Sequence, residues 1–171
     1  IDRGALGGPV VGYAPNTVII DLGTNVDTRP GLLVDFAALG NVMSKLIYKN
    51  ENPRVALLSV GSEEGKGNAL VKETTDLLNS TDLNFIGNIE PNDLPEGKAE
   101  VVLCDGFVGN VILKLTEGLG DAIVSHVKEV LGETDESKKL SQEIFERMNI
   151  LEAFGGGPLL GVNGLAIVGH G

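Results

Sequence analysis

The chain has 171 residues, 42% of them hydrophobic, with a formal net charge of -11. This length and apolar content allow a real hydrophobic core, so we predict a single α/β domain over residues 1–171. An acidic chain is poorly suited to nucleic acid, because Lys and Arg bind phosphate backbones. One cysteine and no signal sequence favour a reducing, cytoplasmic environment.

The longest apolar runs fall short of the roughly 20 residues that a membrane-spanning helix needs, so we expect membrane contact to be at most peripheral. The chain starts at Ile1 without a Met and ends just after a Gly-His pair. We therefore expect it to be a part of a longer protein.

The first third of the chain predicts a connector, a strand and a helix. Residues 1–16 are rich in Gly and Pro and lack periodicity, as a connector would. Residues 17–22 (TVIIDL) predict a buried strand, and a polar cluster at 21–27 follows at its carboxyl end. Pro30 suits the first turn of a helix, and apolar residues at intervals of three or four extend that helix to about Tyr48.

The next stretch repeats this pattern. Residues 54–60 (RVALLSV) predict a strand, 61–68 (GSEEGKGN) a Gly-rich loop, and the following residues a helix to about Leu78. Two such strand-loop-helix units are expected to place their loops on the same rim of one sheet. Residues 84–89 predict a short strand, and 91–97 a turn-rich connection.

The stretch from Glu100 to Gly120 organises the rest of the prediction. An apolar run at 101–103 is typical of a parallel strand covered on both faces, and Asp105 follows its carboxyl end. Gly106 and Gly109 allow a close turn, and the next helix offers unpaired N–H groups to an anion. Ligands of open α/β sheets gather at such strand ends, so we expect chemistry at 105–110.

The remaining chain predicts a projecting helical hairpin and a glycine-rich rim segment. Apolar residues recur at helical spacing over 108–130, the charged segment 132–139 (GETDESKK) interrupts them, and 140–148 resumes the pattern. Residues 155–164 form a third Gly-rich rim segment, and 165–168 predict a last strand.

Four motifs in this order resemble the bacterial phosphate acyltransferases of phospholipid synthesis, the PlsX family. They are DLGTNVD at 21–27, GSEEGKGN at 61–68, CDGFVGN at 104–110 and GGGPLLGVNG at 155–164, followed by GHG. The resemblance covers nearly the whole chain, and four motifs in register are more specific than one Gly-rich loop. The family's chains are about twice as long, so the resemblance places this sequence in their C-terminal half.

The resemblance implies a homodimeric three-layer α/β/α enzyme with a mostly parallel sheet, similar in fold to isopropylmalate dehydrogenases and phosphotransacetylases. Such an enzyme moves a fatty acyl group from acyl carrier protein to inorganic phosphate. The acyl phosphate product then serves a downstream glycerol-phosphate acyltransferase. No cofactor is implied.

Phosphate attack on a thioester needs a dianion pocket, donors for the oxyanion, and a means to stabilise the departing thiolate. Backbone N–H groups at 65–68 and 106–110, with the Lys66 ammonium, would hold phosphate, and His170 would serve as proton donor or phosphate ligand. The predicted catalytic residues are Asp105, Asn110 and His170. The predicted phosphate- or substrate-binding residues are Asn25, Gly65, Lys66, Gly67, Asn68, Gly106, Gly109 and Gly156.

Structural roles compete with these assignments. The asparagines that follow glycine would also serve as turn or helix caps, and Asp21 and Asp105 at strand ends would also serve as turn caps. We favour a packed role for Cys104 over a role as acyl-accepting nucleophile. We also favour a packed or interface role for His126 over a role as a ligand. The role of Glu63 and Glu64 is left open. No cluster has metal-ligand spacing, so we predict no metal.

Two other functions remain in view. A nicotinamide-dependent dehydrogenase of similar fold would need a G-x-G-x-x-G after a strand, which the sequence lacks. A truncated, non-catalytic module could dimerise through the long helix. For the hairpin tip the resemblance implies an apolar membrane-binding loop, but GETDESKK is charged, so we expect weak or absent membrane binding.

Overall fold

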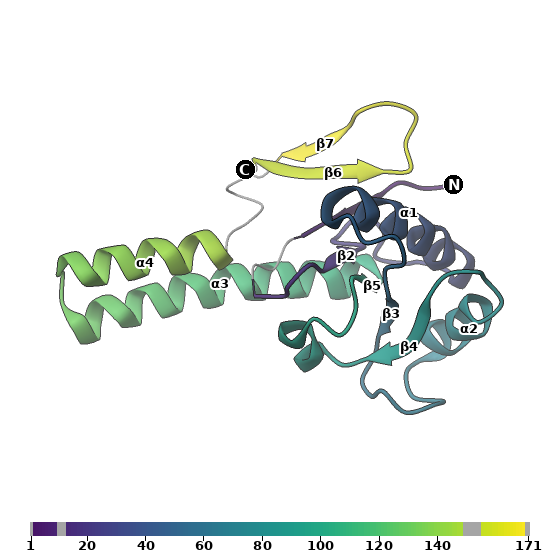
Figure 1. The fold of residues 1–171 in the computed structure, drawn as a ribbon, viewed down its shortest axis with the longest axis horizontal. Coiled ribbons are helices and arrows are strands. Elements are labelled where there is room, and N and C mark those ends of the chain that lie inside the picture. The colour runs from purple at the N-terminus through teal and green to yellow at the C-terminus, as the bar shows by residue number, and fades with distance from the viewer. Residues whose placement is uncertain (1, 10–12, 149–154, 170–171) are drawn as a thin grey trace.

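The computed structural model describes residues 2–9, 13–148 and 155–169 (Figure 1). In chain order the described elements are β1 (Ala5–Gly8), β2 (Val18–Ile20), α1 (Pro30–Tyr48), β3 (Val55–Leu58), α2 (Ala69–Leu78), β4 (Phe85–Ile89), the 3-10 helix η1 (Pro91–Glu96), β5 (Val101–Leu103), α3 (Gly106–Leu131), α4 (Asp135–Met148), β6 (Gly156–Leu160) and β7 (Ile167–Gly169).

The strands form one mixed sheet in the order β4-β3-β5-β2-β1-β6-β7. The β2–β5, β3–β5 and β3–β4 pairs are parallel, whereas β1, β6 and β7 add antiparallel pairs. β5 lies between β2 and β3, so it sits at the centre of the parallel part. The predicted α/β class with parallel strands is confirmed.

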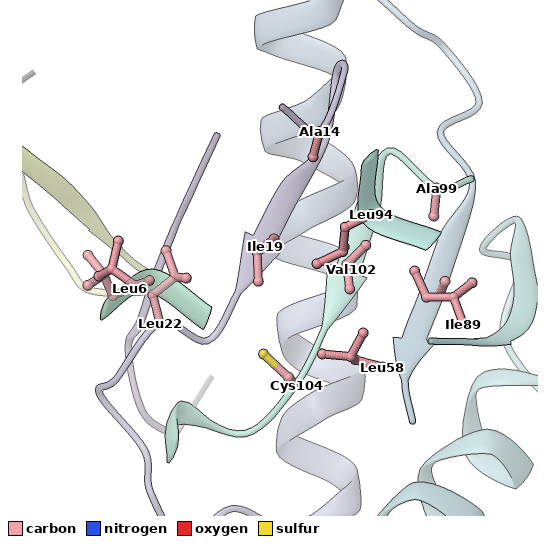
Figure 2. Close-up of a cluster of buried hydrophobic side chains, with 12 residues drawn as sticks. Leu6, Ala14, Ile19, Leu22, Leu58, Ile89, Leu94, Ala99, Val102 and Cys104 are labelled. Carbon is pink, nitrogen blue, oxygen red and sulfur yellow. The ribbon is translucent and has the colours of Figure 1, made fainter. Parts of the chain in front are cut away.

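Alternating side chains on the parallel strands build two hydrophobic layers. Val18 and Ile20 of β2 belong to the cluster that packs with α1 and α2, whereas Ile19 belongs to the cluster that packs with α3. The cluster that packs with α3 also includes Val102 and Cys104 (Figure 2). Because every second residue points to the same face of a strand, the sheet is covered on both sides, as a three-layer α/β/α fold requires.

Helix α1 corrects one expectation from the sequence. By its length and apolar composition alone it would pass as a membrane span. Its Leu32, Leu33 and Phe36 are nevertheless buried against the sheet. A buried stripe of this kind is typical of a core helix in a globular protein.

Three predicted boundaries are wrong. Residues 5–8 of the expected connector form β1, and 156–160 of the expected flexible rim form β6. These strands pair with partners distant in sequence, so local pattern does not reveal them. Helix α4 begins at Asp135 rather than Leu140, because the Thr134 hydroxyl accepts the Ser137 N–H at 3.1 Å and starts the helix.

The predicted helical hairpin is confirmed. The first turns of α3 cover the sheet, and the rest of α3 packs along α4 and projects beyond the sheet (Figure 1). His126 is not packed inside the chain: its side chain is exposed and its Nδ1 lies 3.5 Å from Glu129 Oε2. The packed interpretation of His126 is therefore wrong within one copy of this chain.

Candidate functional site

Three strand-to-helix loops meet at the carboxyl edge of the parallel strands. They are the β2 loop (residues 21–28), the β3 loop (residues 59–68) and the short β5 loop (residues 104–105). β5 pairs in parallel with both β2 and β3, so the β5 loop lies between the other two. The predicted common rim is therefore confirmed, at the edge where α/β proteins bind ligands.

The β2 loop is built around the carboxylate of Asp21, whose residue is 0% exposed. Its Oδ1 accepts the backbone N–H groups of Leu6 (3.2 Å), Gly23 (3.2 Å) and Thr24 (3.1 Å). Its Oδ2 accepts the Asn25 backbone N–H at 2.7 Å and the Asn25 side-chain amide at 2.8 Å. Five donors occupy the roughly four lone-pair positions of a carboxylate, so the turn-capping interpretation of Asp21 is confirmed.

Asn25, a predicted substrate-binding residue, is buried in the same network. Its side-chain amide donates to Asp21 and to the Gly4 carbonyl oxygen at 2.9 Å, which uses both amide hydrogens. Its own carbonyl oxygen accepts the Gly106 N–H at 2.8 Å. The structure therefore gives Asn25 and the Gly106 N–H structural partners, and their ligand roles stay predictions.

Gly109 lets α3 lie directly on the β2 loop. A Cβ built at Gly109 would lie 1.7 Å from the Asp21 carbonyl oxygen, far inside any real contact. A side chain therefore cannot fit without a backbone shift. This close approach explains the glycine independently of any ligand.

Two other predicted site residues cap helices. Asp105 Oδ1 accepts the Val108 N–H at 2.8 Å at the start of α3, and Asn68 Oδ1 accepts the Val71 N–H at 3.0 Å at the start of α2. The capping interpretations are confirmed. Any further role of either side chain has to use its remaining acceptor positions.

Cys104 is packed in the core, as expected. Its Sγ donates to the Asp21 carbonyl oxygen at 3.4 Å, and the residue is buried. Burial, with the charges of Asp105 and Asp21 adding to it, raises the pKa of the Cys104 thiol far above its usual range. A thiol that stays protonated is a poor nucleophile.

Three of the cavities lined by described residues bear on the predicted site. The apolar pocket, about 220 Å³, is lined by Leu33, Leu57, Leu58, Ser59, Val60, Gly67, Asn68, Leu70, Val71, Pro91, Cys104, Asp105 and Val108. The glycine pocket, about 400 Å³, is lined by Leu6, Leu22, Gly23, Thr24, Asn110, Leu113, Lys114, Gly156, Gly157, Val168 and Gly169. The lysine groove, about 400 Å³, is lined by Ser62, Glu64, Gly65, Lys66, Lys72, Thr75, Asp76, Asn79, Phe85, Gly87 and Asn88.

The cavities divide the predicted site residues into separate groups. Gly67, Asn68 and Asp105 line the apolar pocket, Asn110 and Gly156 line the glycine pocket, and Gly65 and Lys66 line the lysine groove. The structure thus does not bring Lys66 and Asn110 into one cavity. His170 lies outside the described residues.

Sequence reasoning missed Lys114, which lines the glycine pocket together with Asn110. The two residues are four apart on α3 and so share a helix face, a signal that the sequence contained. The Lys114 ammonium lies 3.0 Å from Glu117 Oε2. The glycine pocket therefore brings together an amide and a cation, which are groups that bind an oxyanion.

The lysine groove is less suited to an anion. Lys66 and Lys72 share it with the carboxylates of Glu64 and Asp76. Among the described residues, no group of three or more His, Cys, Asp or Glu side chains is placed to hold a metal ion.

Comparison with known proteins points in one direction. The model of a family described as fatty acid synthesis protein matches residues 1–171. A phosphate acyltransferase from Aquifex aeolicus is 43% identical, with 100% of this chain and 52% of the relative covered. One from Carboxydothermus hydrogenoformans is 44% identical, with 100% and 54% covered. The chain thus spans about half the length of the curated relatives it matches.

Proposed function

Since this chain belongs to the fatty acid synthesis protein family, we propose that it is part of an enzyme that transfers a fatty acyl group from acyl carrier protein to inorganic phosphate. The observation that carries this proposal is identity of 43% and 44%, along the whole chain, to relatives named phosphate acyltransferase. The same relatives do not favour a nicotinamide-dependent dehydrogenase. The acyl phosphate product would feed a glycerol-phosphate acyltransferase.

In the reaction an oxygen of phosphate attacks the thioester carbonyl carbon, a C–O bond forms, and the C–S bond breaks. The oxyanion of the tetrahedral intermediate needs hydrogen-bond donors, and the departing thiolate takes up a proton from an acid to become a thiol. The glycine pocket offers the Asn110 amide and the Lys114 ammonium at the required edge of the sheet. Gly169 also lines it, and the predicted proton donor His170 is the next residue in the sequence.

We therefore place the phosphate in the glycine pocket, with Lys114 as its cation and Asn110 facing the charge that develops in the transition state. The sequence-based assignment of phosphate to Lys66 and the β3 loop is the competing proposal. It would place the phosphate in the lysine groove, away from Asn110.

The experiment is a hydroxamate-trapping assay on the full-length protein with acyl carrier protein thioester and phosphate. We expect acyl hydroxamate that depends on phosphate, and a loss of about 10²–10³ in kcat for Asn110→Ala, as for the removal of an oxyanion donor. The isolated 171-residue chain should be inactive or nearly so, because it spans about half the length of the relatives that it matches. Absence of phosphate-dependent product from the full-length protein would overturn the assignment.

We propose that a second copy of the chain covers the exposed face of α3, giving a homodimer. Five exposed apolar side chains recur there at every fourth position: Phe107, Val111, Leu115, Leu119 and Ile123. Contiguous apolar surface of this kind marks an interaction site. Light scattering should show a dimer of the full-length protein, and Leu115→Glu should shift it to monomer whereas Leu46→Glu on α1 should not. A monomeric wild type would contradict the proposal.

We propose a cytoplasmic location with little direct membrane binding. The hairpin tip carries Glu133, Asp135 and Glu136 against Lys138 and Lys139, so it has little attraction to anionic lipid. The apolar side chains of Val130 and Leu131 beside it are exposed, so the tip is less uniformly polar than the sequence suggested. Substantial co-sedimentation of the full-length protein with anionic liposomes at physiological salt would disprove the proposal.

A further inference from the structure

The apolar pocket has no part in the phosphate chemistry proposed above, yet it opens on the same edge of the sheet. Its walls come from all three layers of the fold, and most are aliphatic: Leu33 of α1, Leu57 and Leu58 of β3, Leu70 and Val71 of α2, and Val108 of α3. A cavity lined in this way suits an apolar ligand rather than an ion.

Ser59 places a polar group among these side chains. Residue 59 is 8% exposed, and its Oγ has no hydrogen-bond partner within the part of the chain that the structure describes. Its backbone N–H is satisfied by the Ile89 carbonyl oxygen at 2.9 Å. Buried hydroxyls almost always have a partner, so an unpaired one that lines a pocket points to a ligand that supplies the acceptor.

Gly67 keeps this hydroxyl accessible to the pocket. A Cβ at Gly67 would lie 3.0 Å from Ser59 Oγ and 2.6 Å from a methyl of Val71. Its φ of +97° also favours glycine. The absence of a side chain at this position thus leaves the space between the hydroxyl and the aliphatic wall open.

The order of residues along β3 gives the pocket a direction. Leu57 and Leu58 belong to the strand, Ser59 follows its last residue, and Val60 is 83% exposed beyond it. The aliphatic part therefore lies toward the sheet, and the hydroxyl lies toward the rim. An apolar cavity of about 150 Å³ binds benzene, so a volume of about 220 Å³ accommodates a chain of several carbons.

We propose that the apolar pocket binds the first carbons of a straight acyl chain and that the Ser59 hydroxyl donates a hydrogen bond to the acyl carbonyl oxygen. This inference rests on the proposed function, because it takes the acyl group of that reaction as the ligand. Val108 of α3 lines the apolar pocket, and Asn110 of the same helix lines the glycine pocket. The first turns of α3 thus lie between the two pockets, and the proposal requires the carbonyl carbon to sit at the rim where an oxygen of phosphate can reach it.

The test is calorimetric binding of octanoate to the full-length protein, with acetate as the short-chain comparison. We expect wild type to bind octanoate and not acetate. Val71→Phe, which fills the pocket, and Val60→Asp, which puts a like charge at its mouth, should each weaken octanoate binding about tenfold or more. Leu77→Phe on the exposed side of α2 is the matched control and should bind as wild type does.

Ser59→Ala separates a ligand contact from a packing role. Removing an unpaired buried hydroxyl should leave the melting temperature unchanged or raised. If the hydroxyl meets the carbonyl, octanoate affinity should still fall about threefold to tenfold, as expected for one hydrogen bond. A Ser59→Ala variant with wild-type affinity would overturn the contact to Ser59.

The acyl-pocket proposal and the proposed function fail in different ways. If wild type forms acyl phosphate but Val60→Asp and Val71→Phe keep its octanoate affinity, the pocket proposal is wrong and the function stands. If octanoate binding is lost in these variants but no acyl phosphate forms, the pocket proposal stands and the function is wrong. Failure of octanoate to bind wild type would overturn the pocket proposal directly.

Discussion

The β2 loop and the β3 loop look alike in the sequence and differ in the structure. Each runs from a buried parallel strand to a helix, and each contains glycine and asparagine. In the β2 loop, Asp21 and Asn25 are buried and collect bonds from both β1 and α3. In the β3 loop, residues 62–66 are all exposed, and the one bond described within the loop joins the Lys66 N–H to the Glu63 carbonyl oxygen (3.1 Å). Its other described bonds are at its two ends, from the Ser59 N–H to Ile89 and from the start of α2 to Asn68.

The difference separates structural from functional explanations of a motif. A polar cluster at a strand end is compatible with ligand binding or with a role in holding the loop together. The hydrogen-bond partners of Asp21 show that the cluster in the β2 loop holds the loop together. The β3 loop has few internal bonds, so it is the segment able to change shape when a substrate arrives. We therefore expect changes in the β2 loop to cost much more stability than changes in the β3 loop.

Loss of the Asp21 carboxylate is expected to have the largest effect. Asp21→Ala removes the acceptor of the Gly23, Thr24 and Asn25 N–H groups and of the Asn25 amide, and leaves the Leu6 N–H with the Thr24 hydroxyl as its acceptor. We expect the free energy of unfolding of the full-length protein to fall by about 4 kcal/mol, the sum of several unsatisfied groups after partial relaxation. Urea unfolding measures it. The exposed Asp27 of the same loop is the control: Asp27→Ala should change stability by no more than about 0.5 kcal/mol.

Equal losses from Asp21→Ala and Asp27→Ala would break the comparison, because they would show that the bonds to Asp21 contribute little. Asp21→Asn tests the contribution of these bonds more finely. The amide retains one acceptor oxygen, so its loss of stability should lie between those of wild type and the alanine variant.

Gly109→Ala is expected to cause the next largest loss of stability, because its Cβ would lie 1.7 Å from the Asp21 carbonyl oxygen. Either α3 or the β2 loop has to move, which should cost about 3 kcal/mol. Gly118 of the same helix is the matched control, since a Cβ there meets nothing within 4 Å. Gly118→Ala should stabilise by roughly 0.5–1 kcal/mol through helix propensity. Thermal melts that showed the same sign for both variants would contradict this packing argument.

Much of the parallel half of the fold follows from the sequence. The apolar run at 101–103 predicts β5, and the regular spacing of apolar residues after it predicts α3. These signals are local, because burial on both faces gives a continuous apolar strand and burial on one stripe gives a 3.6-residue period. The common rim then follows from parallel pairing.

Strands β1 and β6 of the antiparallel half do not follow, because they are short, contain glycine and pair with each other across the chain, whereas the last strand predicted at 165–168 overlaps β7. Leu6 of β1 donates its N–H to Asp21 Oδ1, 15 residues away, and pairs with Leu159 of β6. Nothing local distinguishes ALGG from a loop. The role of Asp21 was open for the same reason: its donors include a strand that the sequence did not reveal. The division of Lys66 and Asn110 between cavities likewise depends on where loops fold, which motif spacing does not specify.

Lys114 and Lys66 test which of the two cavities, the glycine pocket or the lysine groove, binds the phosphate. Lys114→Ala should raise the KM for phosphate by a factor corresponding to on the order of 1.5–3 kcal/mol, as for a charged hydrogen bond, and leave affinity for acyl carrier protein nearly unchanged. Lys66→Ala should change the KM for phosphate much less, because Lys66 lines the lysine groove rather than the glycine pocket. Steady-state kinetics of the full-length enzyme with phosphate varied decide the matter. A raised KM in Lys66→Ala alone would restore the sequence-based assignment and move the phosphate to the β3 loop.

Asn68→Ala is expected to have the smallest effect, and it asks whether the β3 loop contributes anything beyond a helix start. The Asn68 side chain accepts the Val71 N–H at 3.0 Å, and removing an N-cap costs about 1 kcal/mol of stability. If the cap is its whole role, the melting temperature should fall while kcat and both KM values, measured well below the melting temperature, stay at wild-type levels.

Asn68→Asp is the matched control, because aspartate caps equally well but adds a negative charge at the rim of the apolar pocket. A cap-only residue predicts that Asn68→Asp restores stability and keeps wild-type kinetics. Stability restored by Asn68→Asp together with a raised KM for the acyl donor would show instead that the β3 loop meets the substrate at this position.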